Sequence, residues 1–198
     1  MNYLAHLFLS DDEEDVLLGN LMGDFVKGRL DDRYPKGIVR GLQQHRRADQ
    51  FARTNAQFQA SRRCIDPALG HLRSVLVDIY YDHFLARDWG ILHPTPLPRF
   101  AARIYALLER RRKELPAGLA AIAPSIVTHD WFNGYGRLET VDLVLKRMVR
   151  RFSRPVDLPR GSVELRRHYA VLRRHFHAFI REAKQSPYIA NGHNPHLA

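Results

Sequence analysis

The sequence predicts an all-α protein built as a single compact multi-helix domain. Apolar residues recur at helical spacing along most of the chain, whereas the strict alternation of a β-strand is scarce. A chain of 198 residues, 45% of them hydrophobic, is long enough for one domain with a well-formed core and barely long enough for two. We therefore expect one helical domain over residues 1–185.

The helices follow one another between turn-forming segments. The first begins in the acidic stretch "DDEED", which suits a helix N-terminus, and closes at Gly28. Proline and glycine punctuate the later part of the chain in "HPTPLP", "LPAG" and "SRPVDLPRG". These patterns predict helices over 12–28, 35–62, 68–89, 97–114, 117–132, 138–152 and 162–184. Residues 186–198 show no periodicity and are expected to form a loosely ordered tail.

Several kinds of protein are excluded by composition. Cys64 is the only cysteine, so neither an intramolecular disulfide nor a cysteine-based zinc site can form, and a metal ion must be held by His, Asp or Glu. No apolar run approaches the roughly 18 to 20 residues that a membrane span needs. The N-terminal "MNYLAHLFLS" lacks a basic leader. We expect a cytoplasmic protein without a membrane span.

The chain is strongly basic, with 31 Lys and Arg against 21 Asp and Glu and a formal net charge of +10. Such an excess indicates a polyanionic partner and accelerates encounter with it. Nucleic acid, an anionic membrane surface and an acidic protein all fit the charge, which does not choose among them.

Polar pairs spaced four residues apart are the main functional signal. Asn20 and Asp24, His45 and Asp49, and Asp78 and Asp82 each project from one face of a predicted helix. The first pair lies among apolar residues and among glycines that permit the close approach of a backbone or a ligand. The third lies in "LVDIYYDHFLARDW", which is otherwise largely apolar. We expect the heads of the second and third pairs to share one site, on two helices packed side by side.

A divalent cation would explain this gathering of acids. A carboxylate taken out of water costs several kcal/mol unless it is paired or bound to a cation. Carboxylates combined with imidazole suit Mn²⁺, Mg²⁺ or Fe²⁺ better than a structural zinc ion. The competing interpretation is that each acid pairs with a nearby arginine, for which Arg46, Arg47 and Arg87 are available. His129 and Asp130 are read as a helix-terminal feature.

Four motifs, in order, resemble the acyl carrier protein phosphodiesterase family. They are "MNYLAHL" at the start, "GNLMGDFVKG" at 19–28, "HRRAD" at 45–49 and "DIYYDHFLARDW" at 78–89. The resemblance implies an HD-phosphohydrolase-like, all-helical enzyme that depends on Mn²⁺ or a similar ion. It further implies hydrolysis of the phosphodiester between 4'-phosphopantetheine and a serine of holo-acyl carrier protein, which leaves the apo carrier. The carrier is a strongly acidic protein, which gives the basic charge a specific meaning.

The motif positions carried over from the family are His6, Asn20, Asp24, His45, Arg46, Asp49, Asp78, Asp82 and His83. The expected metal ligands come from Asp24, His45, Asp49, Asp78 and Asp82, and the expected catalytic residues are His6, Asn20, Arg46 and His83. Arg46 would neutralise phosphate oxygens, and His6 or His83 would protonate the leaving group or orient a ligand.

One departure from the family and two alternatives accompany this hypothesis. The family usually shows Thr-Asp at the positions of Ala52 and Arg53. An HD-type phosphohydrolase acting on a nucleotide would use the same metal site. A non-enzymatic, arginine-rich helical protein that binds nucleic acid is disfavoured, because a nucleic-acid surface gains nothing from four clustered aspartates. We expect an acyl carrier protein as the partner and no nucleic acid.

Overall fold

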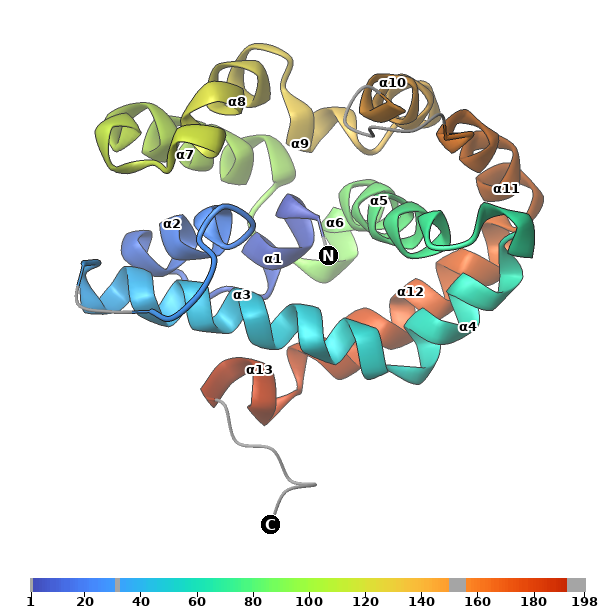
Figure 1. Cartoon of the computed structure of the whole chain (residues 1–198), viewed down its shortest axis with the longest axis horizontal. Helices are drawn as coiled ribbons and strands as arrows, with labels where there is room; N and C mark the ends of the chain where they lie inside the picture. The colour runs from blue at the N-terminus through green and yellow to red at the C-terminus, as the bar shows by residue number, and fades with distance from the viewer. Residues whose placement is uncertain (1, 31–32, 150–155, 192–198) are drawn as a thin grey trace.

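The computed structural model describes residues 2–30, 33–149 and 156–191, and the regular structure in these ranges is helical (Figure 1). The predicted all-α class is therefore confirmed. The helices are α1 Tyr3–Phe8, α2 Glu14–Met22, α3 Lys36–Thr54, α4 Ala56–Cys64, α5 Leu72–Arg87, α6 Trp89–Leu92, α7 Leu97–Arg110, α8 Ala117–Thr128, α9 Trp131–Gly134, α10 Leu138–Met148, α11 Gly161–Arg167, α12 Tyr169–Lys184 and α13 Pro187–Asn191. Within the described residues, no helix is both long and apolar enough to cross a bilayer.

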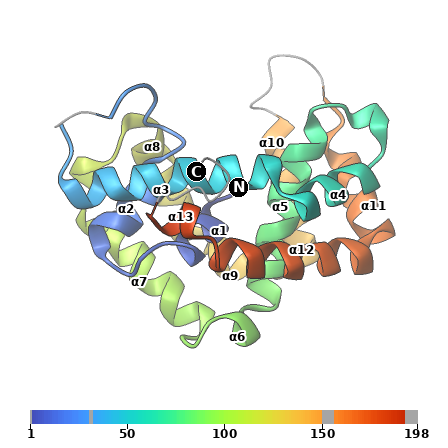
Figure 2. The same cartoon turned by 90° about the horizontal axis from the view of Figure 1, so that it is seen from below.

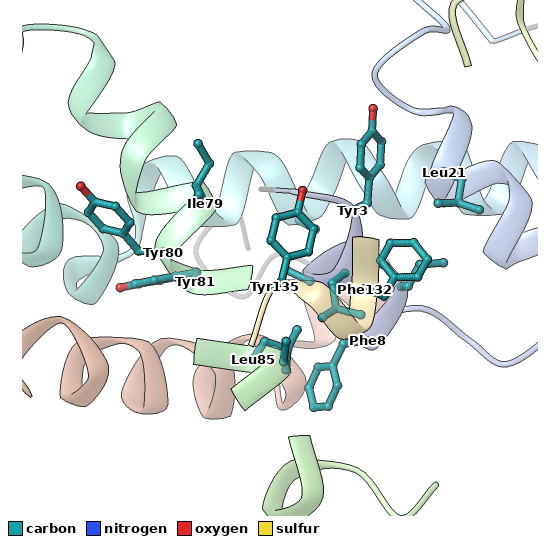
Figure 3. Close-up of a cluster of buried hydrophobic side chains, with 14 of the residues drawn as sticks. Tyr3, Phe8, Leu21, Ile79, Tyr80, Tyr81, Leu85, Phe132 and Tyr135 are labelled. Atoms are coloured by element: carbon teal, nitrogen blue, oxygen red, sulfur yellow. The ribbon is translucent and has the colours of Figure 1, made fainter. Parts of the chain in front are cut away.

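Helix α5 forms the centre of the molecule and packs against α1, α4, α9, α10 and α12 (Figure 1). Tyr80, Tyr81 and Leu85 are buried on different sides of this helix, and Figure 3 shows them among side chains from other segments, including Phe132 and Tyr135. A helix that is apolar nearly all round belongs inside a domain. The run that begins at Leu72 therefore places α5 in the core, and the acids it carries are held there with it.

Helices α2 and α3 approach each other very closely, and two glycines make this possible. A Cβ on Gly19 would overlap the carbonyl oxygen of Ile38 and lie 2.9 Å from the Cα of Gly41. A Cβ on Gly41 would in turn overlap the carbonyl oxygen of Val16. The expectation that glycines in the first motif permit a close backbone approach is met at Gly19, and it brings the end of α2 beside His45.

The predicted helix over 35–62 is two helices in the structure, because Asn55 ends one and begins the other. Its backbone N–H donates to the carbonyl of Phe51 as the last bond of α3. Its side-chain oxygen accepts from the N–H groups of Gln57 and Phe58, which caps α4. An asparagine in this role satisfies helix ends on both sides of a bend.

The ends of the chain also differ from expectation. Helix α1 lies in a segment for which no helix was predicted, and the predicted loose tail contains α13. Helix α13 lies against α3 (Figure 2). Ile189 is buried, and the guanidinium of Arg47 donates to the carbonyls of Ile189 and Ala190. Burial of one isoleucine and capping of carbonyls by an arginine hold this turn, while residues 192–198 lie outside the described part of the chain.

Candidate metal centre and its cavity

Three segments bring imidazole and carboxylate groups together. Helix α1 supplies His6, α3 supplies His45 and Asp49, and the turn after α2 supplies Asp24. Nε2 of His6 lies 3.2 Å from one oxygen of Asp49, and Nε2 of His45 lies 3.4 Å from the other. Nε2 of His45 is also 3.5 Å from Oδ1 of Asp24. His6, His45 and Asp49 can each offer one donor atom such that all three atoms lie within 4.8 Å of one another.

A hydrogen bond to the backbone fixes the orientation of the His45 ring. Its Nδ1 lies 2.8 Å from the backbone carbonyl oxygen of Asn20. Because a carbonyl only accepts, Nδ1 carries the proton in the neutral ring, and Nε2 presents its lone pair to Asp24 and Asp49. A histidine that donates one nitrogen to a carbonyl and offers the other is the usual arrangement of a metal ligand.

Gly23 packs directly against the imidazole ring of His45. A Cβ on Gly23 would overlap several atoms of the His45 imidazole, and its backbone φ of −56° is ordinary, so space alone explains the glycine.

We expect Gly23→Ala to displace the His45 ring and to weaken Mn²⁺ binding by about 10- to 100-fold, as loss of ligand support does in other metal sites. Isothermal titration of the metal-free protein measures the affinity. Gly90→Ala is the matched control, because a Cβ on Gly90 meets nothing within 4 Å. Equal affinities for the wild type and Gly23→Ala would contradict the assignment of His45 as a ligand.

His6 is buried without the partners that a buried histidine normally has. Its ring stacks on that of His45, with centroids 3.7 Å apart. Nδ1 has no hydrogen-bond partner among the described residues, and Nε2 is close to Asp49 but not aligned for a hydrogen bond. Burial and the neighbouring His45 lower the pKa of His6 to about 4, so the ring is neutral at pH 7 and retains a lone pair. A neutral imidazole with an unused nitrogen beside a carboxylate fits a metal ligand.

His45 and the neighbouring carboxylates shift one another's pKa values. Burial alone would lower the pKa of His45, but the carboxylates of Asp24 and Asp49 outweigh it and the pKa is raised. Burial alone would raise the pKa of Asp49, but His45 and His6 outweigh it and hold the pKa far below its usual range. The pKa of Asp24 is lowered by His45 against the effect of burial. The carboxylates are therefore ionised and suited to a hard divalent cation.

Asp82 lies outside this group. It is fully buried, and its two oxygens accept hydrogen bonds from the backbone N–H groups of Leu4 and Ala5, at 3.1 and 3.0 Å. These donors belong to the first turn of α1, where N–H groups have no partner within the helix. The structure thus gives Asp82 a capping role in place of the predicted ligand role. Direct packing of α3 against α5 was expected at the site. Instead, α1 packs against α5, and the ring of His6 on α1 stacks on that of His45 on α3.

His83 also lies apart from His6, His45, Asp49 and Asp24, which together are called the donor group below. Its Nδ1 is 2.8 Å from the carbonyl oxygen of Tyr135, and its Nε2 is 2.9 Å from the hydroxyl of Tyr169. Both nitrogens join α5 to the end of α9 and to α12, and a proton transfer by His83 stays a prediction.

Asn20 and Arg46 act on the backbone around the site. The side-chain N–H groups of Asn20 donate to Gln44, to Ser10 and to the carbonyl of Val16, while its Oδ1 is buried without a hydrogen-bond partner among the described residues. Its backbone carbonyl oxygen contacts Nδ1 of His45, and a catalytic role for its side chain stays a prediction. The guanidinium of Arg46 donates to the carbonyl of Val26, which follows the turn that carries Asp24. The contact of Arg46 with a phosphate stays a prediction.

Asp78 borders a cavity of about 650 Å³ that also reaches Asp24. Burial raises the pKa of Asp78. The far walls of the cavity come from the second half of the chain, with Ile122 and Ser125 from α8, Trp131 from α9, and Val144 and Met148 from α10. The four motifs quoted above contain none of these wall residues, which are spread over three helices.

His129 and Asp130 lie where α8 ends, as expected. The backbone N–H of His129 bonds back to Ser125, and Asp130 has a left-handed φ of 46°. The carboxylate of Asp130 accepts from the hydroxyl of Tyr105 and the amide of Asn133, so it shapes the turn into α9.

Comparison with known proteins agrees with the motifs. The model of the family described as acyl carrier protein phosphodiesterase matches residues 1–183. A protein of that name from Photorhabdus laumondii is 32% identical over 171 residues, which is 86% of each chain. One from Serratia proteamaculans is 31% identical over 93% of this chain and 96% of the relative, and one from Yersinia pestis is 31% identical over 87% and 90%. No solved structure matches this chain.

Proposed function

Since the chain belongs to the acyl carrier protein phosphodiesterase family, we propose that it hydrolyses the phosphodiester that joins 4'-phosphopantetheine to a serine of holo-acyl carrier protein. The observation that carries the proposal is the group of His6, His45 and Asp49, with Asp24 beside it. The imidazoles of His6 and His45 in their neutral form, with the ionised carboxylates of Asp49 and Asp24, would hold a divalent cation. Mn²⁺ is the first choice, and Mg²⁺ or Fe²⁺ are the alternatives. When bound, such an ion stabilises charge on the phosphoryl oxygens and makes water more acidic.

The chain's own groups account for the protons of the reaction. Water adds to phosphorus as the bond from phosphorus to the serine oxygen breaks, so one proton leaves the water and one reaches the serine oxygen. Asp24, which lies 3.5 Å from Nε2 of His45 and lines the cavity, is the proposed acceptor of the proton from water. Asp78, on the same cavity, holds a proton to higher pH than an ordinary aspartate because burial raises its pKa, and it is the donor.

Charge supports an acidic protein as the partner. Many exposed arginines are neutralised within the chain, as in the pairs of Arg103 with Asp12, Arg110 with Glu14 and Arg166 with Asp142. Arg137 and Arg147 border the cavity, are exposed, and have no ion pair among the described residues. Unpaired positive charge beside the cavity favours encounter with an acidic carrier.

Mass spectrometry of holo carrier protein incubated with the enzyme and Mn²⁺ tests the proposal. We expect conversion to the apo carrier with release of intact 4'-phosphopantetheine, and no conversion with a chelator present. Nucleotide phosphodiesters serve as competing substrates in the same assay. An unchanged holo carrier together with efficient nucleotide hydrolysis would overturn the proposal in favour of a nucleotide phosphohydrolase.

A further inference from the structure

The cavity borders the group of possible metal donors at Asp24. Asp24 belongs to both, since it lies 3.5 Å from Nε2 of His45 and lines the cavity. Figure 1 shows α8, α9 and α10 following one another along one side of α1 and α5. The cavity is lined by residues of α1 and α5 and by residues of α8, α9 and α10. A group bound at the metal site would therefore have its longer substituent directed into a volume of about 650 Å³, which is typical of a small-molecule site.

The walls of the cavity combine apolar surface with scattered hydroxyl and amide groups. Ile122, Val144 and the half-buried Trp131 supply apolar area. Tyr3 and Ser125 supply polar groups on other sides. The positive charges, by contrast, lie at the exposed residues Arg137 and Arg147.

The pantetheine arm has the same mixed chemistry. It is uncharged beyond its phosphate and carries a gem-dimethyl group, a hydroxyl, two amides and a thiol in an extended chain. We propose that this cavity binds the pantetheine arm of the substrate, with the phosphodiester at the Asp24 end. The inference rests on the proposed function and adds to it the place where the arm lies and the residues of α8, α9 and α10 that contact it.

The two tryptophans of the chain permit a direct binding test without turnover. Trp131 lines the cavity, whereas Trp89 is 2% exposed and donates its indole N–H to the carbonyl of Thr95. In the full chain labelled with 5-fluorotryptophan, we expect free 4'-phosphopantetheine and pantetheine to shift the fluorine resonance of Trp131 saturably and to leave that of Trp89 in place. Inorganic phosphate alone should not shift Trp131. The two resonances are assigned with Trp131→Phe. A Trp131 resonance that does not shift when pantetheine is added would overturn the inference.

Filling the cavity gives a second, independent test. In the double variant Ile122→Phe with Val144→Phe, we expect KM for holo carrier to rise at least about 10-fold, because lost room for the arm weakens binding. The Mn²⁺ affinity should not change, since neither residue lies on α1, α2 or α3. Val163→Phe is the matched control, because this valine is 61% exposed on α11 and its enlargement should leave KM unchanged. An unchanged KM in the double variant would contradict the inference.

The two proposals fail in different ways. If wild-type protein does not release phosphopantetheine from holo carrier, the proposed function fails, whatever the fluorine titration shows. If wild-type protein does release it while Trp131 and the filled variant behave like their controls, the function stands and the arm lies elsewhere.

Discussion

Replacing His45 with alanine is expected to abolish saturable Mn²⁺ binding and to lower kcat/KM for holo carrier by more than about 100-fold. Loss of a group that merely supports a ligand costs about 10- to 100-fold in metal affinity or activity, and loss of a ligand itself costs more. His45 has the central place in the group, because its Nε2 faces both Asp24 and Asp49 and its ring stacks on His6. Without it, the two carboxylates lose the imidazole between them.

Titration calorimetry and the carrier assay measure these two losses, and circular dichroism reports whether the helices remain. His71→Ala is the control, because His71 is exposed and its side chain makes no capping bond at the start of α5. We expect the control to bind Mn²⁺ and turn over like the wild type. Normal Mn²⁺ affinity in a folded His45→Ala protein would remove His45 from the ligand set and with it the proposed metal centre.

The second large effect concerns Asp82 and the stability of the fold. In Asp82→Ala, the N–H groups of Leu4 and Ala5 remain buried and lose their acceptors. Each unsatisfied buried donor costs about 1–3 kcal/mol, so we expect the free energy of unfolding to fall by about 2–6 kcal/mol. Urea denaturation with the wild type in parallel measures the change. Because α1 carries His6, Mn²⁺ affinity should fall as well, and a variant as stable as the wild type would refute the capping role.

The same residue makes stability depend on pH. Burial raises the pKa of Asp82 from 3.8 to about 7. Between these values the folded protein keeps a proton that the unfolded chain has released, so the contribution of Asp82 to stability is full below about pH 4 and is lost as the pH rises to about 7. At about 1.4 kcal/mol per pKa unit, the loss approaches about 4 kcal/mol.

Asp82→Asn isolates this contribution, since asparagine keeps an acceptor of similar shape and does not titrate. Asp49 and Asp24 have lowered pKa values and act in the opposite direction, but they do so in both proteins. The wild-type free energy of unfolding minus that of Asp82→Asn is expected to fall from pH 4 to 7 and to stay level above. A difference that is constant over this range would show that Asp82 does not titrate there.

Local pattern was sufficient for the class of fold and for the meeting of His45 with Asp49. The recurrence of apolar residues every three to four positions predicts helices wherever the chain is to bury one face, and the regular structure of the described residues is helical. The spacing of His45 and Asp49 on one helix determined that both can reach the same point, and their side chains do meet at 3.4 Å. Asn55 shows the limit of this reasoning, because a single cap divided a periodic pattern that looked continuous.

Only the tertiary structure decided which helix supplies the partner of His45 and Asp49. Spacing along one helix says nothing about which other helix faces it, so the pair on α5 was expected at the site and α1 was not foreseen. A helix of six residues has too few internal hydrogen bonds to be stable by itself. It forms here because Asp82, buried on α5, accepts two of its free N–H groups. That long-range contact turns Asp82 into a cap and places His6 against His45.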